Sequence, residues 1–567
     1  MSEMDLVCYE HDQGFVLEQF QDGTFDYLDA ASEVVETEFF RFIGANRMLK
    51  ELAKTYPSPR KKEQVPVWFY VASNLSMRLH GVHSFNAYPY VVRCGGMLNA
   101  FGAEIAHKAT HPETGDVTLS CSGFNDKNDY DRQTPCDQDT LRKLARDTPA
   151  DELMRWYNTE VAKILKVHKA FDPEGIFIGD GSYIFVPDNP AYEKSVKLLF
   201  DESNHPIDAD DLKAMSPEKV ARCQWRRCYK MVSLFHTDRE GTFFLRVAMT
   251  IVPGNVHEDP VFYELLRTFV KAVGPGVIKR LLLDRGFIDG PEIGRCKQEH
   301  KIDVLIPLKK NMDIYKDALG LMKLPQTRFV EVPSVPSRPV RPPRLPSAPE
   351  PIRRREAKRQ QTLKERQAQQ PPPNPKDTVV IRDAAGIQGF TSFESCPVPL
   401  NVIINRETYG DGHQDIWMLL DTKTWSDPDA AAVAGQQDYH LRTRIEEGHR
   451  QWKCFWDLTG FTSRAFSLVV NQIIFVALAY NLLQLYLKRS EKREELNRRT
   501  RPIVQRQLLP NASWVIIYCQ NRFALLTVYE YTELLFSLTK LAQEKIAQKI
   551  RRIKSSLAVE LAFPRPP

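Results

Sequence analysis

The sequence predicts an α/β protein with a mixed β-sheet flanked by helices, a β-rich insertion in that sheet, and helical regions at both ends of the chain. Two observations support this prediction. Between residues 175 and 308, apolar runs rich in β-branched and aromatic residues alternate with helical patterns, as in sheets covered by helices. Residues 1–165 and the region after 490 instead favour helices. At 567 residues the chain is too long for one core, so two to four domains are expected.

Composition excludes some classes of protein. The 77 Lys and Arg residues nearly balance the 72 Asp and Glu residues, so overall charge does not identify a nucleic-acid-binding protein. The ten cysteines lack metal-site spacing, and the closest two are Cys223 and Cys228. This pattern favours reduced thiols over a zinc site. Neither phosphate-binding glycine motif, G-x-x-x-x-G-K-[ST] or G-x-G-x-x-G after a strand, occurs, so no nucleotide cofactor is expected.

The first candidate metal ligand is Asp180. It lies within the run I-F-I-G-D-G-S-Y-I-F-V at 176–186, which has the composition of a buried strand. A carboxylate in such a strand is costly unless a cation or a proton neutralises it. Gly179 and Gly181 leave room for an ion or a phosphate to approach. The alternative is an aspartate at a strand end that faces water.

The second candidate ligand is Asp284. Strand-like runs at 229–235 and 243–252 predict an antiparallel meander with the first strand, and a helix at about 260–273 follows them. An apolar run at 277–283 then ends in D-R-G-F at 284–287. An acid at the carboxyl end of a strand lies where open α/β sheets place their ligands.

The predicted sheet continues beyond this strand and is then interrupted. A helix at about 291–299 and a strand at 304–308 are expected next. Residues from about 331 to 377 are dense in Pro, Arg and Gln, which predicts an extended linker. Short strands at 378–382, 400–406 and 416–420 then predict a β-rich insertion.

The rest of the chain is organised around residues 439–453, which read Y-H-L-R-T-R-I-E-E-G-H-R-Q-W-K. Good helix formers predict a helix here. A single carboxylate, a phenol and several cations would share one face of that helix, namely Tyr439, Arg442, Glu446, Arg450 and Lys453. Glu447 would point about 100° away from this face. For any one of these residues, a solvated face with i,i+4 ion pairs is the simpler explanation. Together they suggest a carboxylate that holds a divalent cation while its neighbours grip a polyanion.

The spacing of Tyr439, Arg442, Glu446 and Lys453 resembles the Tyr-Arg-Glu-Lys signature of one group of bacterial insertion-sequence transposases. These are DDE enzymes with a ribonuclease-H-like core, and the order β-β-β-α-β and the D-R-G-F sequence resemble that core too. The resemblance implies that Asp180, Asp284 and Glu446 are the catalytic, metal-binding acids. It also implies that Tyr439, Arg442, Arg450 and Lys453 contact DNA.

The chemistry expected from this resemblance is phosphoryl transfer. Three carboxylates brought together need divalent cations between them, and two Mg²⁺ ions, with Mn²⁺ as a substitute, suit displacement at phosphorus. Asp180 would bridge the two ions. The expected reaction is nicking of double-stranded DNA at the element's ends and joining of the 3′-hydroxyl ends to target DNA. Both ends must be held together, so a homodimer is expected.

The resemblance also suggests a division of the chain into parts. We expect a helical N-terminal domain with possible end binding, the first part of the catalytic core, the insertion with its linker, the last part of the core with the Glu446 helix, and a helical C-terminal region with possible dimerisation, at 1–165, 166–310, 311–433, 434–490 and 491–567. In related transposases an aromatic residue of the insertion stacks on a displaced base, and Trp417 and Trp425 are candidates. Packing is the commoner fate of a Trp in a strand.

Residues 465–487 are apolar enough to resemble a membrane span. Polar residues interrupt the segment at Asn471, Gln472, Asn481 and Gln484, so a buried helix packed on the sheet is the better interpretation. The N-terminal sequence resembles neither a signal peptide nor a transit peptide. Together with the resemblance to bacterial insertion-sequence transposases, this leads us to expect a protein of the prokaryotic cytoplasm, associated with the nucleoid and not with a membrane.

Two other functions remain open on the sequence. One is a ribonuclease-H-like nuclease that cuts DNA without strand transfer, which would use the same acids. The other is a catalytically idle DNA-binding protein derived from a transposase. Loss of cleavage on Glu446→Gln substitution would favour an enzyme, and a joined product would separate a transposase from a nuclease.

Overall fold

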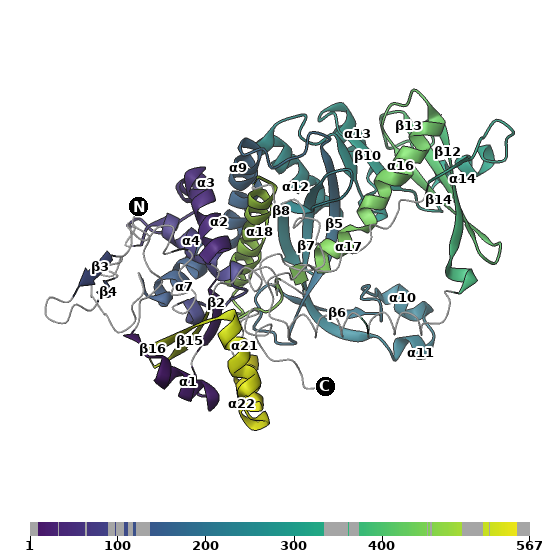
Figure 1. The fold of residues 1–567 in the computed structure, drawn as a ribbon. Helices are drawn as coiled ribbons and strands as arrows, with labels where there is room; N and C mark the ends of the chain where they lie inside the picture. Colours follow the sequence, from purple (N-terminus) through teal and green to yellow (C-terminus); the bar gives the residue numbers. More distant parts are fainter. Residues whose placement is uncertain are drawn as a thin grey trace. The chain divides into compact units, whose positions relative to one another are not determined.

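The computed structural model describes residues 10–25, 27–31, 33–62, 65–88, 97, 107–110, 117–120, 136–333, 361, 374–450, 452–453, 456, 458–489, 514–520 and 522–552. The chain divides into two compact units. The sheet unit comprises Tyr157–Arg344 and Arg354–His449, and the helical unit comprises Met1–Trp156, Leu345–Arg353 and Arg450–Pro567. Figure 1 labels most of the elements of both.

A ten-stranded mixed sheet forms the centre of the sheet unit. Its strands are β5 (Ile176–Val186), β6 (Val196–Phe200), β7 (Gln224–Thr237), β8 (Leu245–Pro253), β9 (Arg280–Leu282), β10 (Asp303–Pro307), β11 (Val330–Glu331), β12 (Val379–Phe390), β13 (Leu400–Tyr409) and β14 (Gln414–Asp421). They lie in the order β11-β12-β13-β14-β10-β9-β5-β7-β6, and β8 also pairs with β7. This mixed sheet flanked by helices confirms the predicted fold class.

The predicted meander is present, because β7 pairs antiparallel with both β5 and β8. β9 lies on the other side of β5 and runs parallel to it, with Ile178 opposite Leu282. Asp180 and Asp284 each follow that pair of residues by two positions. The parallel register therefore places the two aspartates level with each other, Asp180 in the middle of β5 and Asp284 just beyond the end of β9.

The β-rich insertion extends the sheet itself. β14 pairs antiparallel with β10, and β13 and β12 continue outward from it. Most of the predicted linker at 331–377 lies outside the described residues; the short helix η5 (Pro375–Asp377) leads from its end into β12.

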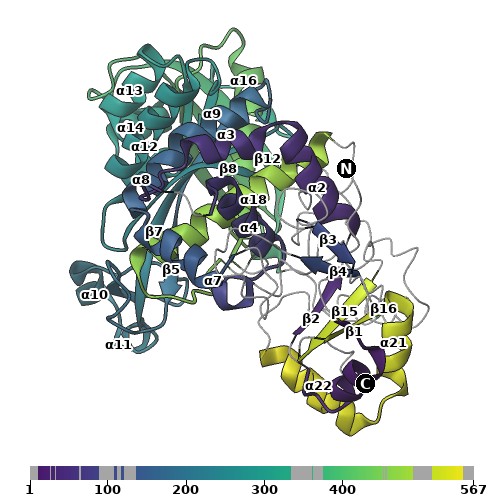
Figure 2. The ribbon, with the colours of Figure 1, turned by 90° about the vertical axis from the view of Figure 1, so that its left-hand side faces the viewer.

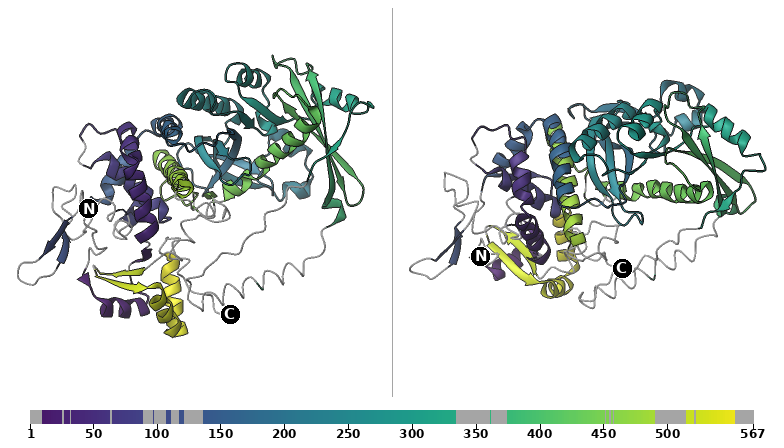
Figure 3. Two further views of the ribbon diagram at one scale, coloured as in Figure 1. Left: turned by 45° about the horizontal axis from the view of Figure 1, so that its top comes forward. Right: turned by 90° about the horizontal axis from the view of Figure 1, so that it is seen from above.

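Helices cover both faces of the sheet. In chain order the helical elements of this unit are η3 (Tyr157–Val161), α9 (Ala162–Val167), α10 (Ala209–Ala214), α11 (Pro217–Val220), α12 (Glu258–Val273), η4 (Arg285–Phe287), α13 (Gly290–Gln298), α14 (Asp313–Leu321), α16 (Pro428–Thr443) and α17 (Ile445–Arg450). On β5, Gly179 faces Phe262 of α12, whereas Asp180 faces Arg442 of α16. Since neighbouring residues of a strand point to opposite faces, α12 and α16 lie on opposite sides of β5. α16 packs against β12 and β13, and Figure 3 shows this green helix beside the green strands.

The helix predicted at 439–453 is interrupted. α16 ends at Thr443, and the backbone N–H of Arg444 donates to Leu441 O, a tighter i→i+3 bond, before α17 begins at Ile445. Arg442 and Glu446 therefore lie on different helices. The regular 100° phase that would align their side chains does not continue across Arg444.

A buried ion cluster fastens α16 to the sheet. The Arg280 guanidinium donates to both oxygens of Asp421, at 2.6 and 3.0 Å, and its Nε donates to Asp438 of α16 at 3.3 Å. Trp425 Nε1 donates to Asp421 at 3.2 Å. Burial raises the pKa of Asp438 above its ordinary value, although Arg280 opposes this shift. Trp425 is therefore buried and hydrogen-bonded within this cluster. This environment favours packing over the suggested stacking of Trp425 on a base.

The helical unit contains α1 (Gln13–Gln21), α2 (Glu33–Ala45), α3 (Met48–Thr55), α4 (Val67–Leu79), η1 (Phe85–Ala87), α7 (Gln138–Asp147), α8 (Ala150–Trp156), α18 (Phe466–Arg489), α21 (Val528–Ser537) and α22 (Lys540–Arg552). It also contains β1 (Glu10–His11), β2 (Tyr27–Ala31), β3 (His107–Thr110), β4 (Val117–Ser120), β15 (Trp514–Cys519) and β16 (Arg522–Thr527). Strands from the two ends of the chain form one small sheet, in the order β1-β16-β15-β2 (Figure 2). The sequence pattern did not predict this pairing.

α18 is long and apolar enough to cross a membrane by length and composition, but 89% of its most apolar window is buried inside the protein. A buried helix was predicted here, with packing against the sheet. In the structure its neighbours within the helical unit are α2, α4, α7 and α8. One of its polar residues, Asn471, donates from its side-chain nitrogen to the Tyr70 hydroxyl at 2.8 Å, which gives that buried N–H group a partner.

The ion cluster leads to a stability prediction. Arg280→Met should lower the free energy of unfolding by about 3–5 kcal/mol, because it leaves Asp421 and Asp438 buried without their cation. Arg222→Met is the matched control: this arginine is more than half exposed and pairs with the equally exposed Glu202, outside the cluster, so its loss should cost less than about 1 kcal/mol. Urea denaturation measures both changes, and equal losses would contradict the structural role given to the cluster.

Candidate active site

Asp180 is buried at the centre of the candidate site. It lies in the middle of β5, and 8% of its surface is exposed. Its Oδ1 accepts a hydrogen bond from Arg442 Nη2 at 3.0 Å, and its Oδ2 lies 2.6 Å from His449 Nε2. Burial alone raises the pKa of Asp180, but the His449 hydrogen bond and the charges of Arg442 and Arg246 outweigh it. The pKa therefore lies below its ordinary value, and the group is a carboxylate at neutral pH.

Asp284 lies beside Asp180 at the end of β9. Its Oδ1 accepts a hydrogen bond from the Arg285 backbone N–H at 2.7 Å, which caps the short helix η4. Its Oδ2 accepts from Arg442 Nη2 at 2.7 Å. The side chain is 41% exposed, so this aspartate borders solvent while its neighbour does not.

One nitrogen atom therefore joins the two aspartates. Arg442 Nη2 is within hydrogen-bonding distance of Asp180 Oδ1 and of Asp284 Oδ2. Each aspartate uses its other oxygen for a contact elsewhere. Burial lowers the pKa of Arg442, but the two carboxylates raise it above its ordinary value, which keeps the guanidinium charged. The positive charge offsets the repulsion that two adjacent carboxylates would otherwise suffer.

His449 and Arg246 are part of this arrangement although the sequence did not single them out. His449 is buried on α17, and Arg246, which has no exposed surface, reaches its Nδ1 from β8 at a distance of 3.2 Å. One signal was available in the sequence. His449 follows Arg442 by seven residues, close to two helical turns, so a regular helix would have placed both on one face.

A third acid, Glu258 at the start of α12, lies against both aspartate motifs. A Cβ atom on Gly181 would collide with Glu258 Oε2, and a Cβ atom on Gly286 would lie 3.0 Å from Oε1. Each glycine follows a candidate aspartate closely in the sequence, and each makes room for the same carboxylate. Lys230 Nζ is 3.9 Å from Glu258 Oε2. Burial raises the pKa of Glu258, Lys230 opposes the shift, and the charges of the two aspartates add to it.

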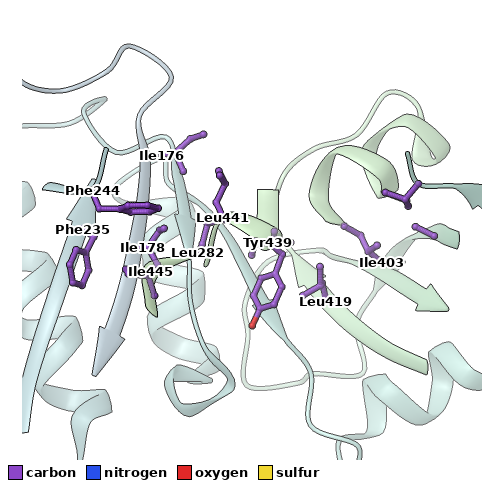
Figure 4. Close-up of a cluster of buried hydrophobic side chains, with 14 of the residues drawn as sticks. Ile176, Ile178, Phe235, Phe244, Leu282, Ile403, Leu419, Tyr439, Leu441 and Ile445 are labelled. Atoms are coloured by element: carbon purple, nitrogen blue, oxygen red, sulfur yellow. The ribbon is translucent and has the colours of Figure 1, made fainter. Parts of the chain in front are cut away.

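Tyr439 is buried and belongs to the hydrophobic cluster of the sheet unit. Figure 4 shows its ring between Leu282 on one side and Leu419 on the other. The ring also packs against Trp417, with centroids 5.8 Å apart. Burial raises the pKa of Tyr439 to about 12, so the hydroxyl keeps its proton at neutral pH. Trp417 therefore packs on a signature residue, and its proposed stacking on a base stays a prediction.

The structure places Glu446 differently from the two aspartates. It lies on α17 with an exposed side chain. The Arg450 side chain is outside the described part of the structure, and Lys453 belongs to the helical unit, where its side chain is half-buried. The assignment of these residues to metal and DNA stays a prediction.

The donor set can be tested against the divalent metal that the sequence predicts. Two hard carboxylate oxygens converge on one point, and the cationic nitrogen of Arg442 stands there, where a metal ion between them would lie. The pair Asp180 and Asp284 therefore fits such an ion. Among the residues described, no group of three His, Cys, Asp or Glu side chains is arranged to hold a metal. Glu446, the third predicted ligand, does not join the two aspartates in such a group.

Comparison with known proteins supports a class for this site. Residues 201–482 match the family model described as "Transposase DDE domain". The match includes Asp284 and the helices that carry Tyr439, Arg442 and Glu446, and it begins after Asp180. No curated protein matches the sequence. The domain match supports a DDE transposase, and the mixed sheet flanked by helices is consistent with the ribonuclease-H-like fold of such enzymes.

The bridging arginine gives a second stability prediction. In metal-free buffer, Arg442→Ala should lower the free energy of unfolding by about 1.5–3 kcal/mol, since it removes two charge-assisted hydrogen bonds and leaves two carboxylates facing each other. Arg444→Ala is the control, because that side chain donates to the exposed Glu240 carbonyl and its loss should cost less than about 1 kcal/mol. Denaturation in the presence of a chelator measures both, and an unchanged Arg442→Ala protein would show that the bridge contributes little.

Proposed function

We propose that the protein is a DNA transposase of the insertion-sequence group with the Tyr-Arg-Glu-Lys signature. It binds the ends of its element, nicks them by metal-dependent hydrolysis and joins the 3′-hydroxyl ends to target DNA. The observation that supports this proposal most strongly is the convergence of Asp180 Oδ1 and Asp284 Oδ2 on one cation, supplied by the signature residue Arg442. The transposase domain match covers that arginine and the second aspartate.

In this proposal Asp180 and Asp284 hold Mg²⁺, or Mn²⁺ in its place. Two such ions, when bound, activate the attacking oxygen and stabilise the leaving oxygen at a phosphorus atom. The protein's own contribution is to keep both carboxylates ionised and level with each other. The low pKa of Asp180 and the parallel register of β5 and β9 support this role.

Glu446 completes the acidic set in this proposal. It precedes His449 by three residues on α17, and residues three apart are neighbours on a helix surface. His449 already contacts Asp180. In this proposal a change in the Glu446 side-chain conformation, without unfolding of α17, brings its carboxylate to the aspartate pair.

The proposed DNA contacts are Tyr439, Arg442, Arg450 and Lys453. Arg442 Nη2 gives its two N–H groups to the two carboxylates, so contact of this nitrogen with a phosphate would require its release from one of them, whereas Nε carries a further N–H. The Tyr439 hydroxyl stays protonated at neutral pH and can donate to a phosphate oxygen. Joining two ends requires both to be held together, so a homodimer on double-stranded DNA, in the prokaryotic cytoplasm at the nucleoid, belongs to the proposal.

The decisive experiment uses the full-length protein and a plasmid that carries the DNA flanking its gene, where short inverted repeats are expected. With Mg²⁺ the wild type should nick at the repeats and produce joined products. Glu446→Gln should abolish cleavage, because the amide is a poor metal ligand, and should retain binding in a gel-shift assay. Glu447→Gln is the matched control, because Glu447 is adjacent to Glu446 but is not part of the Tyr-Arg-Glu-Lys signature. This variant should cleave normally.

Each outcome of that experiment has a distinct meaning. Cleavage by Glu446→Gln at the wild-type rate would contradict the assignment of this glutamate. Cleavage without joined products would replace the transposase by a nuclease. DNA binding without cleavage by the wild type would favour the catalytically idle alternative.

Metal binding without DNA gives a further prediction. Arg442→Ala should bind Mn²⁺ more tightly than the wild type, because the guanidinium no longer competes for Asp180 Oδ1 and Asp284 Oδ2. Arg444→Ala should bind Mn²⁺ like the wild type. Isothermal titration calorimetry measures the affinities, and weaker binding by Arg442→Ala would contradict competition between the arginine and the metal.

A further inference from the structure

We propose that His449 is a positioning residue that orients Asp180, and that Arg246 fixes the histidine in the tautomer this task requires. The inference deepens the proposed function, because it rests on Asp180 as a metal ligand. It concerns a chain of contacts from β8 through α17 to β5, which joins Arg246, His449 and Asp180.

The donors and acceptors in this chain determine its proton. Arg246 Nη2 lies 3.2 Å from His449 Nδ1, and a guanidinium can only donate hydrogen bonds. His449 Nδ1 must therefore accept. The proton of the neutral ring is then on Nε2, which donates to Asp180 Oδ2 at 2.6 Å. With the opposite tautomer, two donors would face each other at Nδ1 and two acceptors would face each other at the carboxylate.

Packing holds the chain in place. Arg246 lies over the Phe235 ring, 4.6 Å from its centroid, and its Nη1 contacts Met231 Sδ at 2.9 Å. The His449 ring meets the same phenylalanine edge-on, with centroids 5.4 Å apart and an interplanar angle of 82°. The Tyr157 hydroxyl donates to the backbone carbonyl of Arg246 at 2.6 Å. A single aromatic ring therefore restrains both the guanidinium and the imidazole.

The consequence for Asp180 is that its two oxygens have different tasks. Oδ2 is held by the imidazole, which fixes the plane of the carboxylate. Oδ1 is left directed toward Asp284 Oδ2 and the cation between them. Outer hydrogen bonds of this kind orient metal ligands, and their loss typically costs about 10- to 100-fold in metal affinity.

Two substitutions separate hydrogen bonding from packing. His449→Leu keeps an apolar side chain against Phe235 but removes both the donor and the acceptor. His449→Gln keeps an N–H that can donate to Asp180 and an oxygen that can accept from Arg246. A purely structural role would tolerate leucine at least as well as glutamine, whereas a positioning role requires glutamine.

The binding experiment measures Mn²⁺ affinity of the full-length, DNA-free protein from the electron paramagnetic resonance signal of free Mn²⁺. His449→Leu should weaken binding by about 10- to 100-fold, and His449→Gln should stay within about threefold of the wild type. His440→Leu, at an exposed histidine of α16, is the control and should leave the affinity unchanged. Wild-type affinity in His449→Leu, or equal weakening in the Leu and Gln variants, would overturn the inference.

Asp180→Asn separates this inference from the proposed function. If Asp180→Asn binds Mn²⁺ as tightly as the wild type, the proposed metal site fails. If Asp180→Asn loses the metal while His449→Leu keeps it, the metal site stands and the role of His449 fails.

A second measurement requires no metal and uses a variant only to assign the signal. In protein labelled with ¹⁵N at histidine, the ring nitrogens of His449 should show a protonated Nε2 and an unprotonated Nδ1 at neutral pH in metal-free buffer. A proton on Nδ1, alone or together with Nε2, would overturn the proposed role of Arg246. Assignment of the signal comes from its absence in His449→Gln.

Discussion

The structure of the candidate site depends on one electrostatic constraint, which is that two carboxylates from neighbouring parallel strands share a single cation. The parallel register of β5 and β9 makes Asp180 and Asp284 level with each other. Two negative charges so close together in a partly buried place need a positive partner. Arg442 supplies it from α16, and the ion cluster around Arg280 fastens that helix to the sheet. The position of the arginine is thus set both by the acids it binds and by a second set of buried charges.

In the metal-free protein, the positive charge of Arg442 partly balances the negative charges of Asp180 and Asp284. The guanidinium of Arg442 occupies the point where a divalent cation would meet both oxygens, so metal and arginine compete for the same ligands. The residue that the sequence assigned to DNA is, without DNA, a partner of the acids. If a metal ion replaced the Arg442 guanidinium between the two aspartates, the guanidinium would become available to bind a DNA phosphate. Metal binding and DNA binding would then be linked. The glycines beside the two aspartates contribute differently, since they admit the carboxylate of Glu258 close to the pair.

The sequence predicted most strands of the large sheet, the positions of the two aspartates at β5 and β9, and the order of the core, because those signals are local. Apolar runs with β-branched residues define strands wherever the chain later places them, and an acid in such a run is conspicuous. The break at Arg444 could not be predicted, because the segment is rich in helix formers and the contacts of Arg442 are tertiary. His449 was hidden for a similar reason: its partners lie 203 and 269 positions away in the sequence. The pairing of the two chain ends in one sheet is equally non-local.

The most direct test of the central claim is the position of Mn²⁺ in a crystal of the DNA-free protein, located by anomalous scattering. A peak is expected between Asp180 Oδ1 and Asp284 Oδ2, with the Arg442 guanidinium moved away from both oxygens and His449 still in contact with Asp180. A saturating concentration of Mn²⁺ that leaves Arg442 bridging the two aspartates, with no peak between them, would contradict the claim.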